Sequence, residues 1–252
     1  MATGCISTAQ IPEIDGLSDY RGNTYHTGKW PHEKVDFTGQ RIAVVGTGSS
    51  GIQAIPVLAE EAEHVTVFQR TPNYSIPSQN GPMHREYEAS WKERYGDLRE
   101  EMRYTGHGSI KDLNDKPAMS VDEDERQTTY KERWKIGGAG FLTSFNDLLF
   151  SQESNDTASE FVRQKIRQIV KDPETAEILA PKTYPIGTKR ICIDSGYFET
   201  YNRDNVDLVD ISETSIKRIT PTGLIANDQT YDFDSIVFAT GFDAMTGTLF
   251  NV

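Results

Sequence analysis

A glycine-rich turn directly behind a short apolar run constrains the fold of this chain most strongly. The run 42–45 (Ile-Ala-Val-Val) leads into 46–51 (Gly-Thr-Gly-Ser-Ser-Gly), and helix-forming residues continue to Glu61. In such turns the glycines allow a tight bend, let backbone amides approach a pyrophosphate, and let the next helix pack on the sheet. The helix N-terminus then presents unpaired N–H groups to the anion. The pattern predicts a dinucleotide-binding strand, turn and helix.

The next strand of this unit ends in a cation where an acidic residue is usual. Residues 65–68 (Val-Thr-Val-Phe) precede Gln69, Arg70 and Thr71, at the place that contacts the adenosine ribose. An aspartate there accepts a hydrogen bond from the 2′-hydroxyl, whereas Arg70 offers a fork of donors that suits a 2′-phosphate, and Thr71 adds a hydroxyl. We therefore expect NADPH to be preferred over NADH. The alternative is that Arg70 is a solvated residue at a strand end.

Length, charge and cysteine spacing exclude several classes of protein. The 252 residues suffice for one large domain or for one domain that carries an insertion. A formal charge of −12 without a cluster of Lys and Arg argues against nucleic-acid binding. No apolar run spans a bilayer and no leader precedes the chain, so a cytoplasmic protein without a membrane partner is expected. Cys5 and Cys192 match no zinc or redox spacing, so both are interpreted as small apolar residues and no metal site is expected.

Helices and then strands follow the first strand, helix and strand. Helices are expected over 84–104, over 141–150 and along the apolar stripe 161–170. A further helix is expected to begin at the capping box Ser120-Val121-Asp122-Glu123 and to end at about Lys135. Another is expected to begin at Pro173. Short strands are expected at 206–209, 216–219, 224–226, 231–233 and 235–239, and they predict a small antiparallel meander. The whole predicts an α/β fold: a Rossmann-like NADPH-binding domain of glutathione-reductase type at 41–81 and 183–240, interrupted by a helical insertion at 82–182.

One segment fits neither helix nor sheet periodicity. Residues 20–31 read Tyr-Arg-Gly-Asn-Thr-Tyr-His-Thr-Gly-Lys-Trp-Pro. This resembles the fingerprint F-x-G-x-x-x-H-x-x-x-W-P/D of Baeyer–Villiger monooxygenases, with Tyr20 for the leading Phe and with Gly22, His26, Trp30 and Pro31 in place. The glycine turn, the segment Gly187-Thr188-Lys189-Arg190 and the strand end Ala239-Thr240-Gly241 are similar to the same family. The resemblance covers essentially the whole chain, and Trp30 distinguishes it from related N-oxidising flavin monooxygenases.

The resemblance implies a flavoprotein that uses NADPH to reduce FAD and uses O2 to insert one oxygen atom beside a ketone carbonyl, giving an ester or lactone. It implies that Arg70, Thr71 and Lys189 hold the NADPH 2′-phosphate. Arg190 would be the catalytic arginine, because a guanidinium stays protonated and can stabilise developing oxygen anions. The other residues expected to bind cofactor are Gly46, Thr47, Gly48, Ser49, Ser50, Gly51, Gln53, Ala239, Thr240 and Gly241. Lys189 and Arg190 could instead be a solvated basic pair.

The resemblance also implies linkers between domains. Residues 1–40 would be an inter-domain linker that contains the fingerprint, and 241–252 the start of a return linker. His26 is interpreted as a hinge residue that positions cofactor and not as the proton donor, because a lone histidine is more often structural. Trp30 is interpreted as packing in the same linker.

The chain departs from the family in holding one glycine-rich turn where the family has two. Met1-Ala2-Thr3-Gly4 resembles the strand end Ala239-Thr240-Gly241, so the chain is expected to be a fragment cut at both ends, without the FAD half. FAD would be bound only in the full-length enzyme, and the fragment would not catalyse alone. Self-association through the cut faces is expected.

Other classes remain as alternatives. The chain could be part of an N- or S-oxidising flavin monooxygenase, or a non-catalytic NADP-binding module. Tyr25 and Lys29 match the Tyr-x-x-x-Lys spacing of short-chain dehydrogenases, but they precede the glycine turn, and Gly28 between them disfavours a helix. Flavoprotein disulfide reductases need a close cysteine pair, which is missing.

Overall fold

Two compact units make up the chain in the computed structural model, which describes residues 4, 6–105, 108–110, 113–244, 247 and 250. Unit 1 consists of Met1–Ser75, Val162–Tyr184 and Ile191–Val252. Unit 2 consists of Ile76–Phe161 and Pro185–Arg190. The expected strand end at residues 1–3 and the interpretation of Cys5 fall outside the described residues, whereas Cys192 is buried and its sulfur accepts a hydrogen bond from Ser49 Oγ at 3.5 Å.

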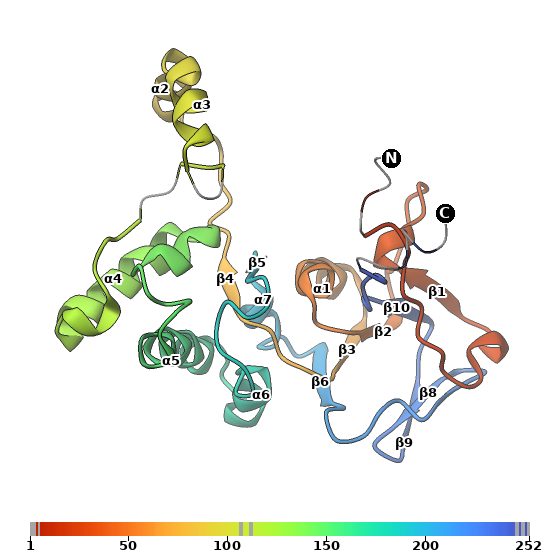
Figure 1. Cartoon of the computed structure of the whole chain (residues 1–252). Coiled ribbons are helices and arrows are strands. Elements are labelled where there is room, and N and C mark those ends of the chain that lie inside the picture. Colours follow the sequence, from red (N-terminus) through yellow and green to blue (C-terminus); the bar gives the residue numbers. More distant parts are fainter. Residues whose placement is uncertain are drawn as a thin grey trace. The chain divides into compact units, whose positions relative to one another are not determined.

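A five-stranded parallel sheet is the framework of unit 1 (Figure 1). Its strands, in spatial order, are β1 (Asn23–His26), β10 (Ser235–Phe238), β2 (Arg41–Val45), β3 (His64–Gln69) and β6 (Val206–Asp210). Every neighbouring pair is parallel. The three central strands are buried along most of their length, which is why the sequence shows them as continuous apolar runs. The predicted strands at 42–45 and 65–68 are confirmed.

The helix expected between these two strands, which ends at Glu61, is also confirmed. It is α1 (Ser49–Glu61), and it packs against both strands. Its buried residues Ile52, Ile55, Leu58 and Ala59 recur at intervals of three and four, so they share one face of the helix. Burial of this face holds the glycine turn at the carboxyl edge of the sheet.

The predicted antiparallel meander forms, but from three of the five expected runs. It consists of β7 (Arg218–Thr220), β8 (Gly223–Ala226) and β9 (Gln229–Asp232). The runs 206–209 and 235–239 belong instead to β6 and β10 of the parallel sheet. Local spacing identified all five as strands but carries no information on which distant strand each one pairs with.

The meander covers part of the parallel sheet through an apolar cluster. Members of the cluster alternate along the sheet strands, as expected for one face of a pleated sheet. They are Ala43, Val45, Phe68, Ile211, Ile219, Leu224, Ala226, Phe233, Ile236 and Phe238. The ring of Phe68 lies edge-on to Tyr231 and Phe233, with centroids 5.3 Å and 5.9 Å away. This cluster anchors the end of β3 immediately before Arg70.

Strand β1 was not predicted. Residues Asn23–His26 pair in parallel with Ser235–Phe238 at the sheet edge, inside the segment that was expected to be a linker. Only His26 of this strand is buried, so the segment lacks the apolar alternation that identifies a strand from sequence.

Smaller elements complete unit 1. They are the 3₁₀ turns Leu17–Asp19 and Thr27–Lys29, strand β5 (Cys192–Asp194), and helices α6 (Pro173–Leu179) and α7 (Tyr197–Thr200). The predicted start of α6 is confirmed, because Pro173 is its first residue and the Asp172 carboxylate accepts a hydrogen bond from Thr175 N at 2.8 Å.

Unit 2 is mainly helical. Its helices are α2 (Arg85–Glu93), α3 (Tyr95–Arg103), α4 (Glu123–Ile136) and the first part of α5 (Gln152–Ile169), with 3₁₀ turns at Ala118–Ser120 and Gly138–Thr143. Strand β4 (Ser75–Pro77) lies at the unit boundary. An aromatic cluster of Tyr130, Trp134, Phe141, Phe145 and Phe161 forms its core. Among the helices of the described part of the chain, none is long and apolar enough to cross a bilayer.

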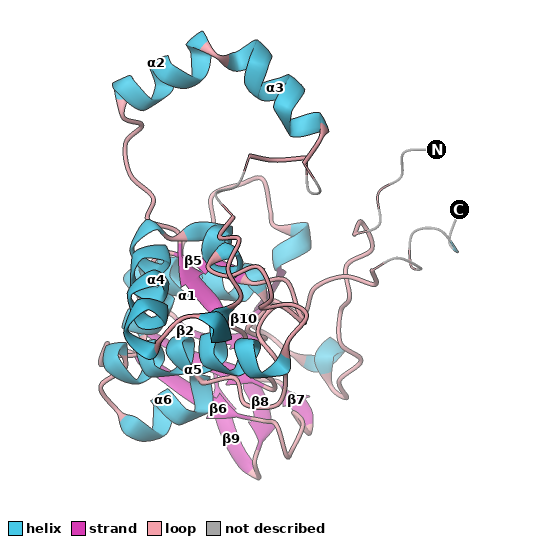
Figure 2. Cartoon of the chain, turned by 60° about the vertical axis from the view of Figure 1, so that its left-hand side comes forward, coloured by secondary structure: helices cyan, strands magenta, loops and turns pink. Residues whose placement is uncertain are grey.

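Three details of unit 2 differ from the sequence-based expectations. Helix α4 is capped by Asp122, whose carboxylate accepts from Glu125 N, and not by Ser120, whose hydroxyl donates to Pro117 O. The expected helix 141–150 is a 3₁₀ turn followed by irregular turns. The expected helix 84–104 is two helices that Arg94 separates, visible as the short loop between α2 and α3 in Figure 2.

Candidate functional site

The three glycines of the turn have different surroundings. Gly46 has φ 103°, and a Cβ there would lie 2.8 Å from Ala239 O. A Cβ on Gly51 would overlap the carbonyl oxygen of Gly46. Gly48, in contrast, has an ordinary φ of −78°, and a Cβ there would meet nothing within 4 Å. Gly46 and Gly51 are therefore required for packing, whereas Gly48 leaves its backbone open to an approaching ligand.

A hollow of about 520 Å³ opens beside this turn, at the carboxyl ends of β2, β3 and β10. Ligand pockets commonly occupy about 300–1,000 Å³, and open α/β sheets bind ligands at this edge. Eight of the residues predicted to bind cofactor line it: Gly46, Thr47, Gly48, Arg70, Thr71, Ala239, Thr240 and Gly241. The fold thus brings together three segments that are far apart in sequence.

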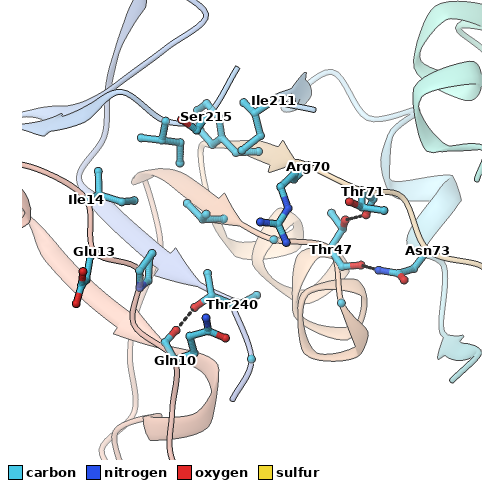
Figure 3. A pocket seen from close by; sticks show the side chains of 18 residues that line it. Gln10, Glu13, Ile14, Thr47, Arg70, Thr71, Asn73, Ile211, Ser215 and Thr240 are labelled. Atoms are coloured by element: carbon cyan, nitrogen blue, oxygen red, sulfur yellow. Dashed lines mark hydrogen bonds between the residues drawn. The ribbon is translucent and has the colours of Figure 1, made fainter. Parts of the chain in front are cut away.

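Arg70 extends its guanidinium into this hollow (Figure 3). Its side chain is exposed and makes no hydrogen bond or ion pair with any residue that the structure describes. Thr71 beside it is partly buried, and both residues follow the last residue of β3. A guanidinium with all five N–H donors available at the mouth of a hollow is suited to a phosphate group.

Side-chain hydrogen bonds tie the glycine turn to the end of β3. Thr47 Oγ1 donates to Thr71 O at 3.2 Å, and Asn73 Nδ2 donates to Thr47 O at 2.7 Å. Asn73 also lines the hollow, although sequence reasoning missed it. Its place three residues after Arg70, at the same sheet edge, is the signal that could have found it.

The remaining predicted residues of the turn form the start of α1. Ser49, Ser50, Gly51 and Gln53 do not line the hollow themselves. The first N–H groups of any α-helix lack an intrahelical partner, and the first turn of α1 contains no acidic residue. Gln53 instead supports the structure, since its Nε2 donates to Ile193 O at 3.2 Å. The start of α1 can therefore accept an anion.

Residues from the N-terminal segment and from the loop after β6 form the other walls. Gln10, Glu13 and Ile14 contribute on one side, and Ile211 and Ser215 on another (Figure 3). No sequence motif marks these residues, because their position depends on how distant segments cross. Within the N-terminal segment, Gln10 N donates to Gly241 O at 2.9 Å, which holds this segment beside the end of β10.

His26 connects the fingerprint to the place where the N-terminal segment lies beside the end of β10. Its Nδ1 accepts from Gly28 N at 3.0 Å, so the proton of a neutral ring is on Nε2, which lies 3.3 Å from Thr240 Oγ1. The Thr240 hydroxyl in turn donates to Gln10 O. His26 is buried, and this chain of hydrogen bonds links the end of β1 to two walls of the hollow.

We expect His26→Ala to destabilise the folded chain by about 1–3 kcal/mol, because the Gly28 amide loses its acceptor and the Thr240 hydroxyl keeps only its hydrogen bond to Gln10 O. His26→Asn is the matched variant: its shorter amide can still accept from an N–H two residues on but does not reach Thr240. Urea unfolding should rank wild type above the Asn variant and the Asn variant above the Ala variant. Equal stability of all three would contradict this role.

The other fingerprint residues pack locally. Tyr20 OH donates to Phe233 O at 2.9 Å, and burial raises the pKa of this phenol to about 12. A Cβ on Gly22 would lie 2.5 Å from Asp234 O. The half-exposed Trp30 packs against Tyr25 and Phe37, with ring centroids 5.5 Å and 6.1 Å away, and Pro31 follows it. These contacts fix the edge strand, while a hinge function for the segment stays a prediction.

A second hollow, of about 800 Å³, shares Arg70 and Thr71 with the first. Its wall includes Glu177 and Lys182, whose Nζ lies 2.8 Å from Glu177 Oε2. Arg167 Nε approaches the other carboxylate oxygen at 2.5 Å. Hydrogen bonds from Arg167 and Lys182 lower the pKa of Glu177 to about 2.

The depressed pKa of Glu177 predicts a pH-dependent contribution to stability. Because the folded-state pKa lies below its ordinary value of 4.5, the contribution is present above about pH 4.5 and is lost as pH falls toward about 2. The carboxylate is 43% exposed, so we expect no more than about 1 kcal/mol. Urea unfolding of wild type and Glu177→Gln should differ at pH 7 and converge toward pH 3. A gap that widened in acid would contradict this.

Lys189 and Arg190 lie in unit 2, and both are exposed. Within that unit, Asn155 holds the segment: its Nδ2 donates to Ile186 O at 2.8 Å and its Oδ1 accepts from Ile186 N at 3.1 Å. Gly187 follows with φ 90°, a conformation that favours glycine. The contact of Lys189 with a phosphate and the catalytic role of Arg190 stay predictions.

Comparison with curated proteins finds monooxygenases as relatives of the chain. The chain is 44% identical to 2-oxo-Δ3-4,5,5-trimethylcyclopentenylacetyl-CoA monooxygenase of Pseudomonas putida, over 98% of this chain and 47% of the relative. It is 36% identical to a Baeyer–Villiger monooxygenase of Pseudooceanicola batsensis, over 97% of this chain and 45% of that relative. It is 38% identical to phenazine N-monooxygenase of Lysobacter antibioticus, over 98% of this chain and 46% of that relative. No family model matches the chain.

Solved structures agree with these relatives. A steroid monooxygenase bound to NADP superimposes with a TM-score of 0.94 at 51% identity, covering 98% of this chain and 47% of that chain. OTEMO in complex with FAD and NADP gives a TM-score of 0.96 at 43% identity, covering 100% of this chain and 48% of that chain. All of these relatives and neighbours are monooxygenases. By sequence and by fold the chain is similar to the Baeyer–Villiger monooxygenases among them, and it spans about half the length of the curated relatives it matches.

Proposed function

We propose that this chain is the NADPH-binding part of a flavin-dependent monooxygenase that inserts an oxygen atom beside a ketone carbonyl to give an ester or lactone. The observation that carries the proposal is the hollow at the carboxyl edge of the sheet. There the glycine turn, the open backbone of Gly48 and the guanidinium of Arg70, which has no partner in the described part of the chain, face one space. The steroid monooxygenase and OTEMO structures compared above were both solved with NADP.

The residues present fit a phosphorylated dinucleotide. The absence of a side chain at Gly48 and the unpaired amides of α1 suit a pyrophosphate, and Arg70 with Thr71 suits the 2′-phosphate that distinguishes NADPH from NADH. In this proposal Lys189 adds a second charge to the 2′-phosphate, and Arg190 stabilises oxygen anions near the reacting carbonyl. NADPH would supply a hydride to FAD, which with O2 provides the oxygen atom.

The proposed organisation follows the expected domains. Residues 41–81 and 183–240 form the Rossmann-like NADPH-binding domain, 82–182 a helical insertion, and 1–40 and 241–252 the linkers to a domain that binds FAD. The isolated chain would bind NADPH without turning over a ketone, since the flavin carries the chemistry. Self-association of the isolated chain stays a prediction that light scattering can test.

A thermal-shift experiment on the 252-residue chain tests the proposal. A ligand that binds only the folded state raises the melting temperature, by an amount that grows with the logarithm of its concentration divided by its Kd. NADP at a saturating concentration should raise the melting temperature by several degrees, and NAD at the same concentration by much less. An unchanged melting temperature with both nucleotides would contradict the proposal. A yellow protein that consumes NADPH when a ketone is added would contradict the proposed inactivity of the isolated chain.

The 38% identity to phenazine N-monooxygenase favours a second candidate, an N-oxidising flavin monooxygenase. Trp30 at the end of the fingerprint favours the ketone-oxidising type. Assay of the complete enzyme against cyclic ketones and against aromatic amines would separate the two. Ester or lactone products would support the first candidate, and N-oxides the second.

A further inference from the structure

We propose that Lys182 is a specificity-determining residue for the phosphorylated nucleotide, and that it exchanges its ion pair with Glu177 for an ion pair with the 2′-phosphate. This inference rests on the proposed function and deepens it. Lys182 belongs to neither the glycine turn nor the fingerprint, and no motif in the sequence marks it.

The two hollows meet at Arg70. Arg70 and Thr71 line both of them, and Lys182 lines the second. A phosphate bound to the Arg70 guanidinium would therefore lie next to the second hollow, which Lys182 lines. All these residues belong to unit 1.

The backbone beside Lys182 is fixed to the same strand end as Arg70. Gln69, the residue before Arg70, donates from Nε2 to Ile178 O at 2.9 Å. Pro181, the residue before Lys182, accepts from Tyr74 OH at 3.2 Å through its carbonyl oxygen. The Lys182 side chain itself is 53% exposed, so its flexible stem can redirect the ammonium without moving the backbone.

The present partner of Lys182 can release it at low cost. Glu177 is held on its other side by Arg167, with Nε 2.5 Å from Oε1 and Nη2 3.4 Å from Oε2. When Lys182 turns away, the carboxylate keeps a two-pronged ion pair with a guanidinium. Exposed ion pairs of the kind that Lys182 leaves contribute little to stability.

The acidic residues of the second hollow disfavour a bound anion unless a cation in the same hollow offsets them. Glu174, Glu177 and Asp210 line it together with Arg70 and Lys182. Arg167 offsets one of these carboxylates, and Asp210 accepts from Ser212 N at 2.8 Å but has no cationic partner among the described residues. Without Lys182 the remaining carboxylates would repel a phosphate dianion more strongly than a neutral 2′-hydroxyl. Removal of Lys182 should therefore weaken NADP binding selectively.

Calorimetric titration of the 252-residue chain with NADP and with NAD tests this inference. Lys182→Gln should weaken NADP binding about five- to tenfold and change NAD binding less than about twofold, as expected for one lost charge pair at a half-exposed site. Lys182→Arg should restore at least half of the lost NADP affinity. Lys171→Gln is the matched control, because Lys171 is an exposed lysine of the same unit that lines neither hollow.

The outcomes separate this inference from the function it rests on. Wild-type protein that binds NADP, together with an unchanged affinity of Lys182→Gln, would overturn the inference and leave the proposed function intact. Equal weakening of NADP and NAD binding would also overturn it, since that pattern indicates a general structural change. Wild-type protein that binds neither nucleotide would overturn the proposed function and this inference with it.

Discussion

Gly51→Ala should lower the free energy of unfolding of the chain by about 2–4 kcal/mol and abolish NADP binding. Of the substitutions considered, we expect this one to have the largest effect. Its Cβ would overlap the carbonyl oxygen of Gly46 and lie 3.3 Å from the Ala239 side chain, both part of the fixed sheet edge. Relief requires α1 to move away from β2, and this displaces the helix N-terminus that faces the hollow. Urea unfolding and NADP titration measure the two effects.

Gly48→Ala is the matched control for this substitution. The added methyl group meets nothing within 4 Å, so stability should change by no more than about 1 kcal/mol. NADP binding should still weaken by about tenfold, because the methyl group occupies the space through which a pyrophosphate reaches the backbone. If Gly48→Ala lowered stability as much as Gly51→Ala, the assignment of separate roles to the two glycines would be wrong.

Arg70→Gln should weaken NADP binding by about 10- to 100-fold and leave NAD binding almost unchanged. The range follows from about 1.5–3 kcal/mol for hydrogen bonds to a charged group. Selectivity follows from the 2′-phosphate being the part of NADP that NAD lacks. Because Arg70 has no partner among the described residues, its replacement should not alter stability, and circular dichroism melting can verify this.

Arg41→Gln controls for the loss of a positive charge. Arg41 is a half-exposed arginine at the start of β2, and it lines neither hollow. Its substitution should change the affinity for either nucleotide less than about twofold. A loss of NADP and NAD affinity to the same degree in Arg70→Gln would show that Arg70 supports the fold and not the phosphate.

The parts of the site that could be predicted are those whose residues lie close together in the sequence. The glycine turn and Arg70 depend on a strand, a bend and a helix within about 30 residues, a unit whose requirements are local. Asn73 was missed although it lies in the same stretch, because an amide after a strand is common in loops. The expected helix 84–104 is interrupted at Arg94, and the spacing of apolar residues does not predict this break.

The parts that could not be predicted depend on pairings over long distances. Strand β1 has one buried residue, His26, so its identity comes from pairing with β10 more than 200 positions later. Gln10 reaches the hollow through the same crossing. Lys182 lines the same hollow as Arg70 because side chains of β3 and of the residues that follow it hold the segment after α6. Local sequence patterns do not encode such contacts.

A crystal structure of this chain with NADP tests the central claim most directly. We expect the pyrophosphate at Gly48 and the first turn of α1, and the 2′-phosphate within hydrogen-bond distance of the Arg70 guanidinium. A nucleotide bound away from the glycine turn, or one whose 2′-phosphate points into solvent away from Arg70, would contradict the account.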